Sequence, residues 1–179
     1  MKRVWLAAIA LMALSGCINR DAIYANPPPE LLKQLDLLLP AANRFVEESE
    51  AAAMANGVAL DDQQQALARS LGIREVERVR VYYVDALPSP TDPQLLPLAK
   101  RYGYSSPAMG AYTYGYGIWI KTPYRHDREL LAHELVHVHQ GERLGREALT
   151  RQYLMQLFIY GYNNAPLELE AYRIAGSLR

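Results

Sequence analysis

The stretch His133-Glu134-Leu135-Val136-His137 lies within a segment from about Asp127 to Gln140 whose pattern predicts one amphipathic helix. Because an α-helix has 3.6 residues per turn, His133 and His137 stand one above the other on the same face of that helix. Glu134 follows His133 directly, so its carboxylate lies beside the two imidazoles. These three side chains are the strongest candidates for a functional site.

The segment around this pattern carries its own helix signals. Asp127 can cap the beginning of the helix, and Gly141 sits where the helix would end. An apolar stripe of Leu131, Leu135 and Val138 faces roughly away from the two histidines. We therefore expect one side of the helix to pack into a core and the other side to be free for a ligand.

Two imidazoles one helical turn apart can hold one Zn²⁺ ion, and Glu134 can then reach a water on the metal without being a ligand itself. The other histidines are not expected to join this pair, because His139 is two residues past His137 and points to another face, and His126 precedes the helix. Cys17 is the only cysteine of the chain, so any metal must be held by histidine and carboxylate side chains.

A third ligand is available further along the chain. The pattern from Arg146 to Tyr160 predicts a helix, the next four residues turn the chain, and Pro166 opens a final helix in its first turn. Glu168 follows in that first turn, far enough beyond His137 for one helix to lead away and another to return. A glutamate there also favours the positive helix N-terminus, which does not exclude ligation.

An H-E-x-x-H pattern followed by a helical E-x-x-A, here Glu168-Leu169-Glu170-Ala171, resembles the gluzincin branch of the zincin metallopeptidases. In that branch a downstream glutamate is the third zinc ligand, and Glu168 fits this role. Ala171 shares a face with Glu168, and its small side chain lets the two helices close on each other. Glu170 lies about 200° around the helix, so it is the second choice of ligand or a partner of Arg173.

The resemblance covers about residues 75–176 and implies an α+β, zincin-like fold. In such a fold a small antiparallel or mixed sheet lies next to an active-site helix, here with an N-terminal helical segment and C-terminal helices. It also implies a zinc metallopeptidase, a hydrolase that cuts peptide bonds with zinc-activated water. His133, His137 and Glu168 would bind the Zn²⁺ ion and leave a fourth position open, and Glu134 would be the general base.

Other parts of the catalytic machinery cannot be assigned from the sequence. Tyr153, Tyr160 and Tyr162 lie between the proposed ligands, and any of them could stabilise the oxyanion. No substrate-binding residue can be identified. The alternative function is a non-catalytic zinc-binding or scaffold lipoprotein of the envelope, but a structural metal site would not need Glu134. A helical interaction protein with a chance motif is a third possibility.

Residues 1–16 have the pattern of an export signal, with two basic residues and then an apolar run from Val4 to Leu14 that is too short to span a bilayer. Leu14-Ser15-Gly16-Cys17 resembles a bacterial lipobox, which implies cleavage before Cys17 and lipidation of its thiol. An ordinary cleaved signal with an incidental cysteine is the alternative. In the lipoprotein class, Ile18 favours sorting to the outer membrane. We therefore expect a lipid-anchored envelope protein that faces the periplasm and acts on peptides or proteins.

The rest of the chain is expected to form a single domain. Residues 17–29 end in three prolines and predict a tether, residues 30–72 a helical N-terminal segment, and residues 73–179 the zincin core. The chain has 19 basic and 19 acidic residues, and loss of the two basic residues of the signal leaves it slightly acidic. This balance argues against nucleic acid as a partner. The oligomeric state cannot be inferred.

Apolar residues recur at helical spacing within residues 30–72. Pro40 is expected to break the first helix. A second helix is expected from Ala41 to Asn56, and Asp61 or Asp62 can cap a third that ends at Gly72.

Two later segments alternate in the way that half-buried strands do, Glu75 to Val84 and Tyr112 to Ile120, with a proline-rich loop and a short helix from about Pro93 to Tyr102 between them. The second strand carries Gly115 and Gly117, where its backbone can approach a substrate chain or a packed helix. It is either the strand that pairs with a substrate backbone, as in the zincins that the chain resembles, or a core strand with aromatic packing.

Overall fold

The computed structural model describes residues 19–104 and 106–178, so residues 1–16, expected to be a signal peptide, and Cys17 lie outside the described residues. Within these ranges the chain is α+β, as expected, with seven α-helices and one four-stranded mixed sheet. None of the described helices combines the length and the apolar character that crossing a membrane requires. The α-helices are α1 (Arg20–Ala25), α2 (Pro29–Asn56), α3 (Asp62–Ser70), α4 (Leu95–Arg101), α5 (Arg128–Leu144), α6 (Arg146–Tyr160) and α7 (Pro166–Gly176).

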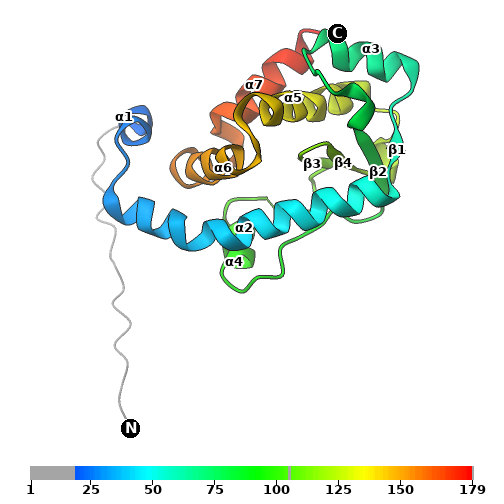
Figure 1. Cartoon of the computed structure of the whole chain (residues 1–179). Coiled ribbons are helices and arrows are strands. Elements are labelled where there is room, and N and C mark those ends of the chain that lie inside the picture. The colour runs from blue at the N-terminus through cyan, green and yellow to red at the C-terminus, as the bar shows by residue number, and fades with distance from the viewer. Residues whose placement is uncertain (1–18, 105, 179) are drawn as a thin grey trace.

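The sheet is small and has helices on both faces (Figure 1). Its strands are β1 (Val58–Ala59), β2 (Arg80–Val84), β3 (Ala111–Tyr114) and β4 (Gly117–Lys121), in the order β1-β2-β4-β3. Strands β2 and β4 are parallel, and the other two pairs are antiparallel. Helix α5 packs on one face through Leu135 and Val138, which meet Ile118 and Ile120 of β4 in the main core. Full burial of each such side chain stabilises the fold by about 1.5–3 kcal/mol.

The single strand expected from Tyr112 to Ile120 is instead a hairpin of β3 and β4. The chain reverses at Gly115, whose φ of +58° is a conformation that only glycine adopts readily. Residue types alternate without a break through the turn, and for that reason the pattern suggested one strand. In the hairpin the turn reverses the faces, because Tyr112 pairs with Trp119 and Thr113 with Ile118. Strand β3 consequently lies at an edge of the sheet, whereas β4 lies between β2 and β3.

Helix α2 covers the other face of the sheet and explains both glycines of the hairpin. A Cβ atom at Gly117 would lie 2.6 Å from the Cβ of Ala53 on α2, and one at Gly115 would lie 2.0 Å from a carboxylate oxygen of Glu50. The Glu50 carboxylate accepts a hydrogen bond from the backbone of Tyr116 in the turn. Both glycines therefore make room for a packed helix rather than for a substrate chain.

The expectation that Pro40 ends a helix was wrong, because α2 continues through it. The helix changes direction along its length in Figure 1, as expected where a proline removes one hydrogen bond from the helix interior. Leu38 and Ala42 on either side of Pro40 are buried, so packing against the rest of the molecule holds the helix together there. The cap expected for the next helix is present, since Asp61 forms a reciprocal capping box with Gln64.

The helix that carries His133 and His137 also continues further than expected. Asp127 caps α5 by accepting a hydrogen bond from the backbone N–H of Leu130, but the helix continues beyond Gly141 to Leu144. Gly145, with a φ of +83°, separates α5 from α6. A glycine inside a helix weakens it without ending it, whereas a positive φ does end it.

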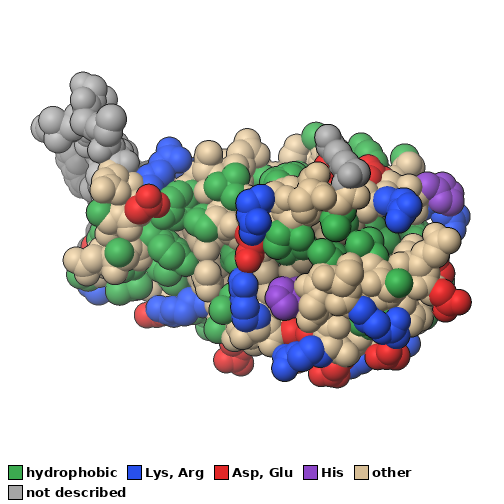
Figure 2. Space-filling model, turned by 90° about the horizontal axis from the view of Figure 1, so that it is seen from above, with side chains coloured by type: hydrophobic (Ala, Val, Ile, Leu, Met, Phe, Trp, Pro, Cys, Tyr) green, Lys and Arg blue, Asp and Glu red, His purple; other side chains and the backbone are tan. Residues whose placement is uncertain are grey.

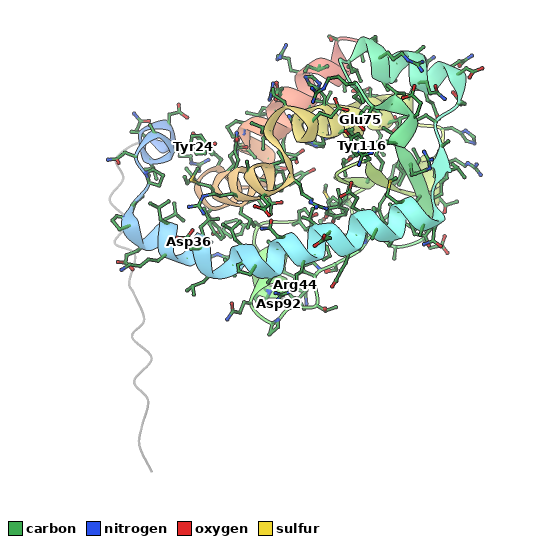
Figure 3. The ribbon with its side chains drawn as sticks, in the orientation of Figure 1. Tyr24, Asp36, Arg44, Glu75, Asp92 and Tyr116 are labelled. Carbon is green, nitrogen blue, oxygen red and sulfur yellow. The ribbon has the colours of Figure 1, made fainter. Side chains whose placement is uncertain are left out.

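Residues 19–26 form a helix and its caps rather than an extended tether. The ring of Tyr24 on α1 lies 5.7 Å from that of Tyr160 on α6, and Figure 3 shows Tyr24 on the side of α1 that faces α6. Tyr160 donates to Asp21, and Arg20 donates to the backbone oxygen of Tyr160. This segment is therefore docked on the domain.

Charges are mixed over the face seen in Figure 2, where basic and acidic side chains alternate around hydrophobic ones. Several of the charged residues form exposed ion pairs between elements, such as Arg151 of α6 with Asp36 of α2, which is labelled in Figure 3. Exposed pairs of this kind contribute about 0–1 kcal/mol each. The helices are therefore held together mainly by their apolar contacts.

Candidate metal centre

The structure brings His133, His137 and Glu168 together although they come from two helices. The Nε2 atoms of the two histidines are 3.1 Å apart, and Oε2 of Glu168 lies 3.2 Å from that of His133 and 3.5 Å from that of His137. His133 and Glu168 are buried, and the His137 side chain is 14% exposed. The three side chains could hold a metal ion.

The spacing of the three atoms fits a tetrahedral ion. Zinc binds imidazole nitrogen and carboxylate oxygen at about 2.0–2.2 Å, and tetrahedral bonds of that length set the ligand atoms about 3.3 Å apart. The three distances, 3.1, 3.2 and 3.5 Å, cluster around this value. Three protein ligands of this type leave a fourth position open.

The hydrogen bonds of His137 also suit a ligand. Its Nδ1 lies 2.8 Å from the amide oxygen of Gln140, which can only accept, so Nδ1 carries the proton and Nε2 offers its lone pair to the centre. The amide nitrogen of Gln140 donates in turn to a carboxylate oxygen of Glu170 at 2.8 Å. This pairing of a ligating histidine with a fixed acceptor is typical of metal sites.

Glu170, the second choice of ligand, consequently lies outside the centre. It pairs with Arg143 of α5 at 3.1 Å, rather than with Arg173 as expected, and it supports Gln140. The two glutamates are two residues apart and therefore about 200° apart around the helix, which directs Glu168 inward and Glu170 toward α5. A signal for Gln140 was present in the sequence, because it stands three residues after His137 on the same helix face.

Glu168 is held in place from both ends. Its Oε1 accepts a hydrogen bond of 2.7 Å from the hydroxyl of Tyr153 on α6, which leaves Oε2 to face the histidines. Behind it, the buried amide of Gln156 accepts from the backbone N–H of Leu167 in the first turn of α7. Ala171 is fully buried where α7 packs on α5, and its small side chain allows the two helices to approach closely.

Glu134 lies beside the cluster and is not one of the three ligands. Its Oε2 accepts a hydrogen bond of 2.6 Å from the hydroxyl of Thr113, and the same hydroxyl contacts the backbone oxygen of Glu134. Thr113 lies on β3, so the edge strand orients this carboxylate. Sequence reasoning did not assign Thr113, because nothing in the spacing shows which face of a hairpin meets the helix.

The charges of the centre shift the pKa values of its members. Burial raises the pKa of Glu134 above its usual value, although both histidines and the Thr113 hydroxyl reduce that effect. Burial also opposes the charged form of Glu168, but the facing His137, with hydrogen bonds from both histidines, holds its pKa well below the usual range. Burial would lower the pKa of His137, yet the Glu168 carboxylate raises it to about 9.

Two cavities meet at this cluster. A cavity of about 370 Å³ reaches His137, Glu134 and Glu168 between α5, α6, β3, α2 and α4. Its far wall is largely apolar and includes Phe45, Leu98, Leu154 and Phe158. A second cavity of about 310 Å³ opens toward the loop before β3 and reaches His133 and Glu134 from the other side. Glu134 therefore borders both cavities.

The three tyrosines between the ligands have different partners. Tyr153 binds Glu168, and Tyr160 binds Asp21 at the contact with α1, outside the centre. Tyr162 borders both cavities, and Tyr172 lines the second one with it. The ring of Tyr172 in turn lies 4.4 Å from that of His133.

The two histidines that were not expected to be ligands lie elsewhere. His126 is exposed before the beginning of α5. The ring of His139 packs against Gly72, where a Cβ atom would lie 3.1 Å from it. Neither belongs to the cluster of possible metal ligands.

Comparisons with protein-family models, with curated proteins and with solved structures find no match to this chain. The interpretation of the centre therefore depends on its own geometry.

Proposed function

We propose that the protein is a zinc-dependent metallopeptidase of zincin-like architecture that hydrolyses peptide bonds in the cell envelope, where lipid at Cys17 anchors it. The observation that carries the proposal is a buried pair of histidines and a glutamate at tetrahedral spacing, with a second carboxylate beside them that is not a ligand. A zinc site that only supports the fold is closed by four protein ligands, whereas this one has three and faces a cavity.

A zinc ion bound by His133, His137 and Glu168 would supply Lewis acidity, which polarises a carbonyl and lowers the pKa of water toward about 7. Glu134 accepts a proton from the attacking water as the water oxygen bonds to the carbonyl carbon. It then gives the proton to the nitrogen of the leaving amine as the carbon–nitrogen bond breaks. Thr113 fixes the orientation of Glu134 for both transfers, and Tyr153 and Gln140 hold two of the ligands.

The edge strand β3 supports a peptide as the substrate. It borders the cavity beside Glu134, and its outer edge has no partner strand among the described strands. A peptide that enters in an extended conformation can pair with such an edge while its side chains reach alternate pockets. The apolar wall opposite suits an apolar side chain of that peptide.

The substitution Glu134→Gln tests this function. The variant should bind zinc as tightly as the wild type, because Glu134 is not a ligand, and should lose nearly all hydrolysis of a mixture of internally quenched peptides. Full hydrolysis by this variant would show that Glu134 is not the general base. A wild-type protein that binds zinc and cleaves no peptide would instead favour the zinc-binding scaffold.

A further inference from the structure

The hydroxyl of Tyr112 is buried without a hydrogen-bond partner among the described residues. Tyr112 lies on β3 and is only 6% exposed. Nearly all buried polar groups in proteins have a partner, and an unpaired one costs about 1–3 kcal/mol. The simplest explanation for retaining this hydroxyl is a hydrogen-bond partner that is not part of the protein.

The position of Tyr112 indicates what that group is. Tyr112 forms part of the wall of the larger cavity, together with Glu134, His137 and Glu168. Burial raises the pKa of its hydroxyl far above the usual value, and the charges of Glu134 and Glu168 raise it further. The hydroxyl therefore keeps its proton at any physiological pH and can act as a donor to a molecule in the cavity.

The ring of Tyr112 is fixed in place by its neighbours. It is stacked on the ring of Tyr104, with the centroids 4.3 Å apart and the planes 6° from parallel. The hydroxyl of Tyr104 bonds to that of Tyr114 on the same strand. These contacts fix the direction of the Tyr112 hydroxyl before a substrate binds. A donor that stabilises charge developing in a transition state has to be preorganised in this way.

We propose that Tyr112 donates a hydrogen bond to the carbonyl oxygen of the scissile peptide, and that this bond strengthens as negative charge develops on that oxygen. This role depends on the proposed peptidase function. Two of the tyrosines considered from the sequence are less suited, because Tyr153 is bound to Glu168 and Tyr160 to Asp21. The unpaired hydroxyl belongs to a residue outside the segment between the ligands.

Tyr112→Phe and Tyr114→Phe form a matched pair, because each removes one hydroxyl from the same strand. Tyr114→Phe leaves Tyr104 unpaired, so it should lower the melting temperature by about 2–12 °C. Tyr112→Phe removes a hydroxyl with no protein partner, so its melting temperature should be unchanged or higher. A drop with Tyr112→Phe equal to that with Tyr114→Phe would show that its hydroxyl is paired within the protein and would overturn the proposal.

The functional measurements use zinc-loaded full-length protein. For Tyr112→Phe, kcat on internally quenched peptides should fall about 10²–10³-fold, whereas Tyr114→Phe, which keeps the Tyr112 hydroxyl and the ring of Tyr104 stacked on it, should lose far less. A dipeptide phosphonamidate, whose tetrahedral phosphorus carries oxygens in place of the attacked carbonyl, should bind Tyr112→Phe at least tenfold more weakly by calorimetry.

The outcomes separate the two proposals. Equal rates and equal phosphonamidate affinity in Tyr112→Phe and the wild type would overturn the role of Tyr112 while leaving the peptidase intact. A zinc-loaded wild type that neither cleaves the peptides nor binds the phosphonamidate would overturn the peptidase, and the role of Tyr112 with it.

Discussion

Gln140 is the residue that decides which nitrogen of His137 faces the centre. Its amide oxygen accepts a hydrogen bond from the Nδ1–H of His137, and its amide nitrogen donates to Glu170 and to the backbone oxygen of Leu167. The amide is fully buried and therefore cannot rotate into water. A histidine held in this way is oriented for a metal before the metal arrives, which lowers the entropy lost on binding.

The substitution Gln140→Met should weaken zinc binding about 10–100-fold, because His137 would lose the acceptor that fixes its tautomer and orientation. The measurement is competition against a chromophoric chelator at pH 7.5. His139→Gln is the matched control, since His139 packs on Gly72 and should leave zinc affinity unchanged. Equal affinity in Gln140→Met and the wild type would show that the amide does not support the ligand.

Zinc affinity should rise with pH. Without metal, the Glu168 carboxylate outweighs burial and raises the pKa of His137 from 6.5 to about 9, so zinc has to displace a proton below that pH. Calorimetry at pH 7.5 in buffers of different ionisation enthalpy should show about one proton released per zinc. No proton release would mean that His137 is already neutral.

The same shift affects the stability of the metal-free protein. A pKa that is raised on folding contributes stability that is fully present below pH 6.5 and is lost as pH rises through about 9. Urea unfolding of the metal-free form should therefore show stability falling over this range, and His137→Gln should remove that slope.

At the scale of the elements, the hairpin of β3 and β4 depends on Gly115, because a larger residue there would clash with α2. Gly115→Ala meets both a positive φ and the Glu50 carboxylate, whereas Gly145→Ala meets a positive φ of +83° with no atom within 4 Å. The backbone strain alone costs about 1–2 kcal/mol. Gly115→Ala should therefore be clearly more destabilising in urea unfolding than Gly145→Ala. Equal losses would mean that Glu50 moves aside at no cost.

The elements that were predicted well are those with local signals. Helix α6 begins and ends where the pattern placed it, Pro166 opens α7, and Asp61 and Asp127 cap α3 and α5. The errors occurred where tertiary contacts override a local rule. Pro40 is retained inside α2 by buried neighbours, and a turn at Gly115 divides a segment whose residue types alternate without a break.

The candidate centre was predictable in its ligands and not in its surroundings. Helical periodicity is enough to place His133 and His137 on one face and to direct Glu170 away from Glu168. Thr113 reaches Glu134 from an edge strand whose position depends on how the whole sheet is ordered, and Tyr112 of the same strand lines the cavity. Sequence spacing carries no information about that arrangement.

Over the whole molecule, the centre is connected to the N-terminal helices through Gln156. Its buried amide donates to the hydroxyl of Tyr24 on α1 and accepts from the backbone of Leu167 at the beginning of α7. Helix α6 therefore carries on one side the docked N-terminal segment and on the other the helix that supplies Glu168. The N-terminal segment forms part of the folded domain, as Figure 1 also shows for α2.

The substitution Gln156→Leu should destabilise the protein by about 1–3 kcal/mol in urea unfolding, because it leaves the buried N–H of Leu167 unpaired. Asp36→Asn is the comparison at the contact of α6 with α2, since it breaks only the exposed pair with Arg151 and should cost less than about 1 kcal/mol. A larger loss from Asp36→Asn would mean that surface charge, and not the buried amide, holds α6 in place.

The most direct test of the centre is the zinc content of the purified protein, measured by elemental mass spectrometry after purification without chelator. About one zinc per chain is expected, and it should be lost in a His133→Ala, His137→Ala double variant and strongly reduced in Glu168→Ala. The His139→Gln control should retain its zinc. A wild-type chain that holds no zinc even after zinc is added back would contradict the account, and the cluster would then be a buried ion pair between His137 and Glu168.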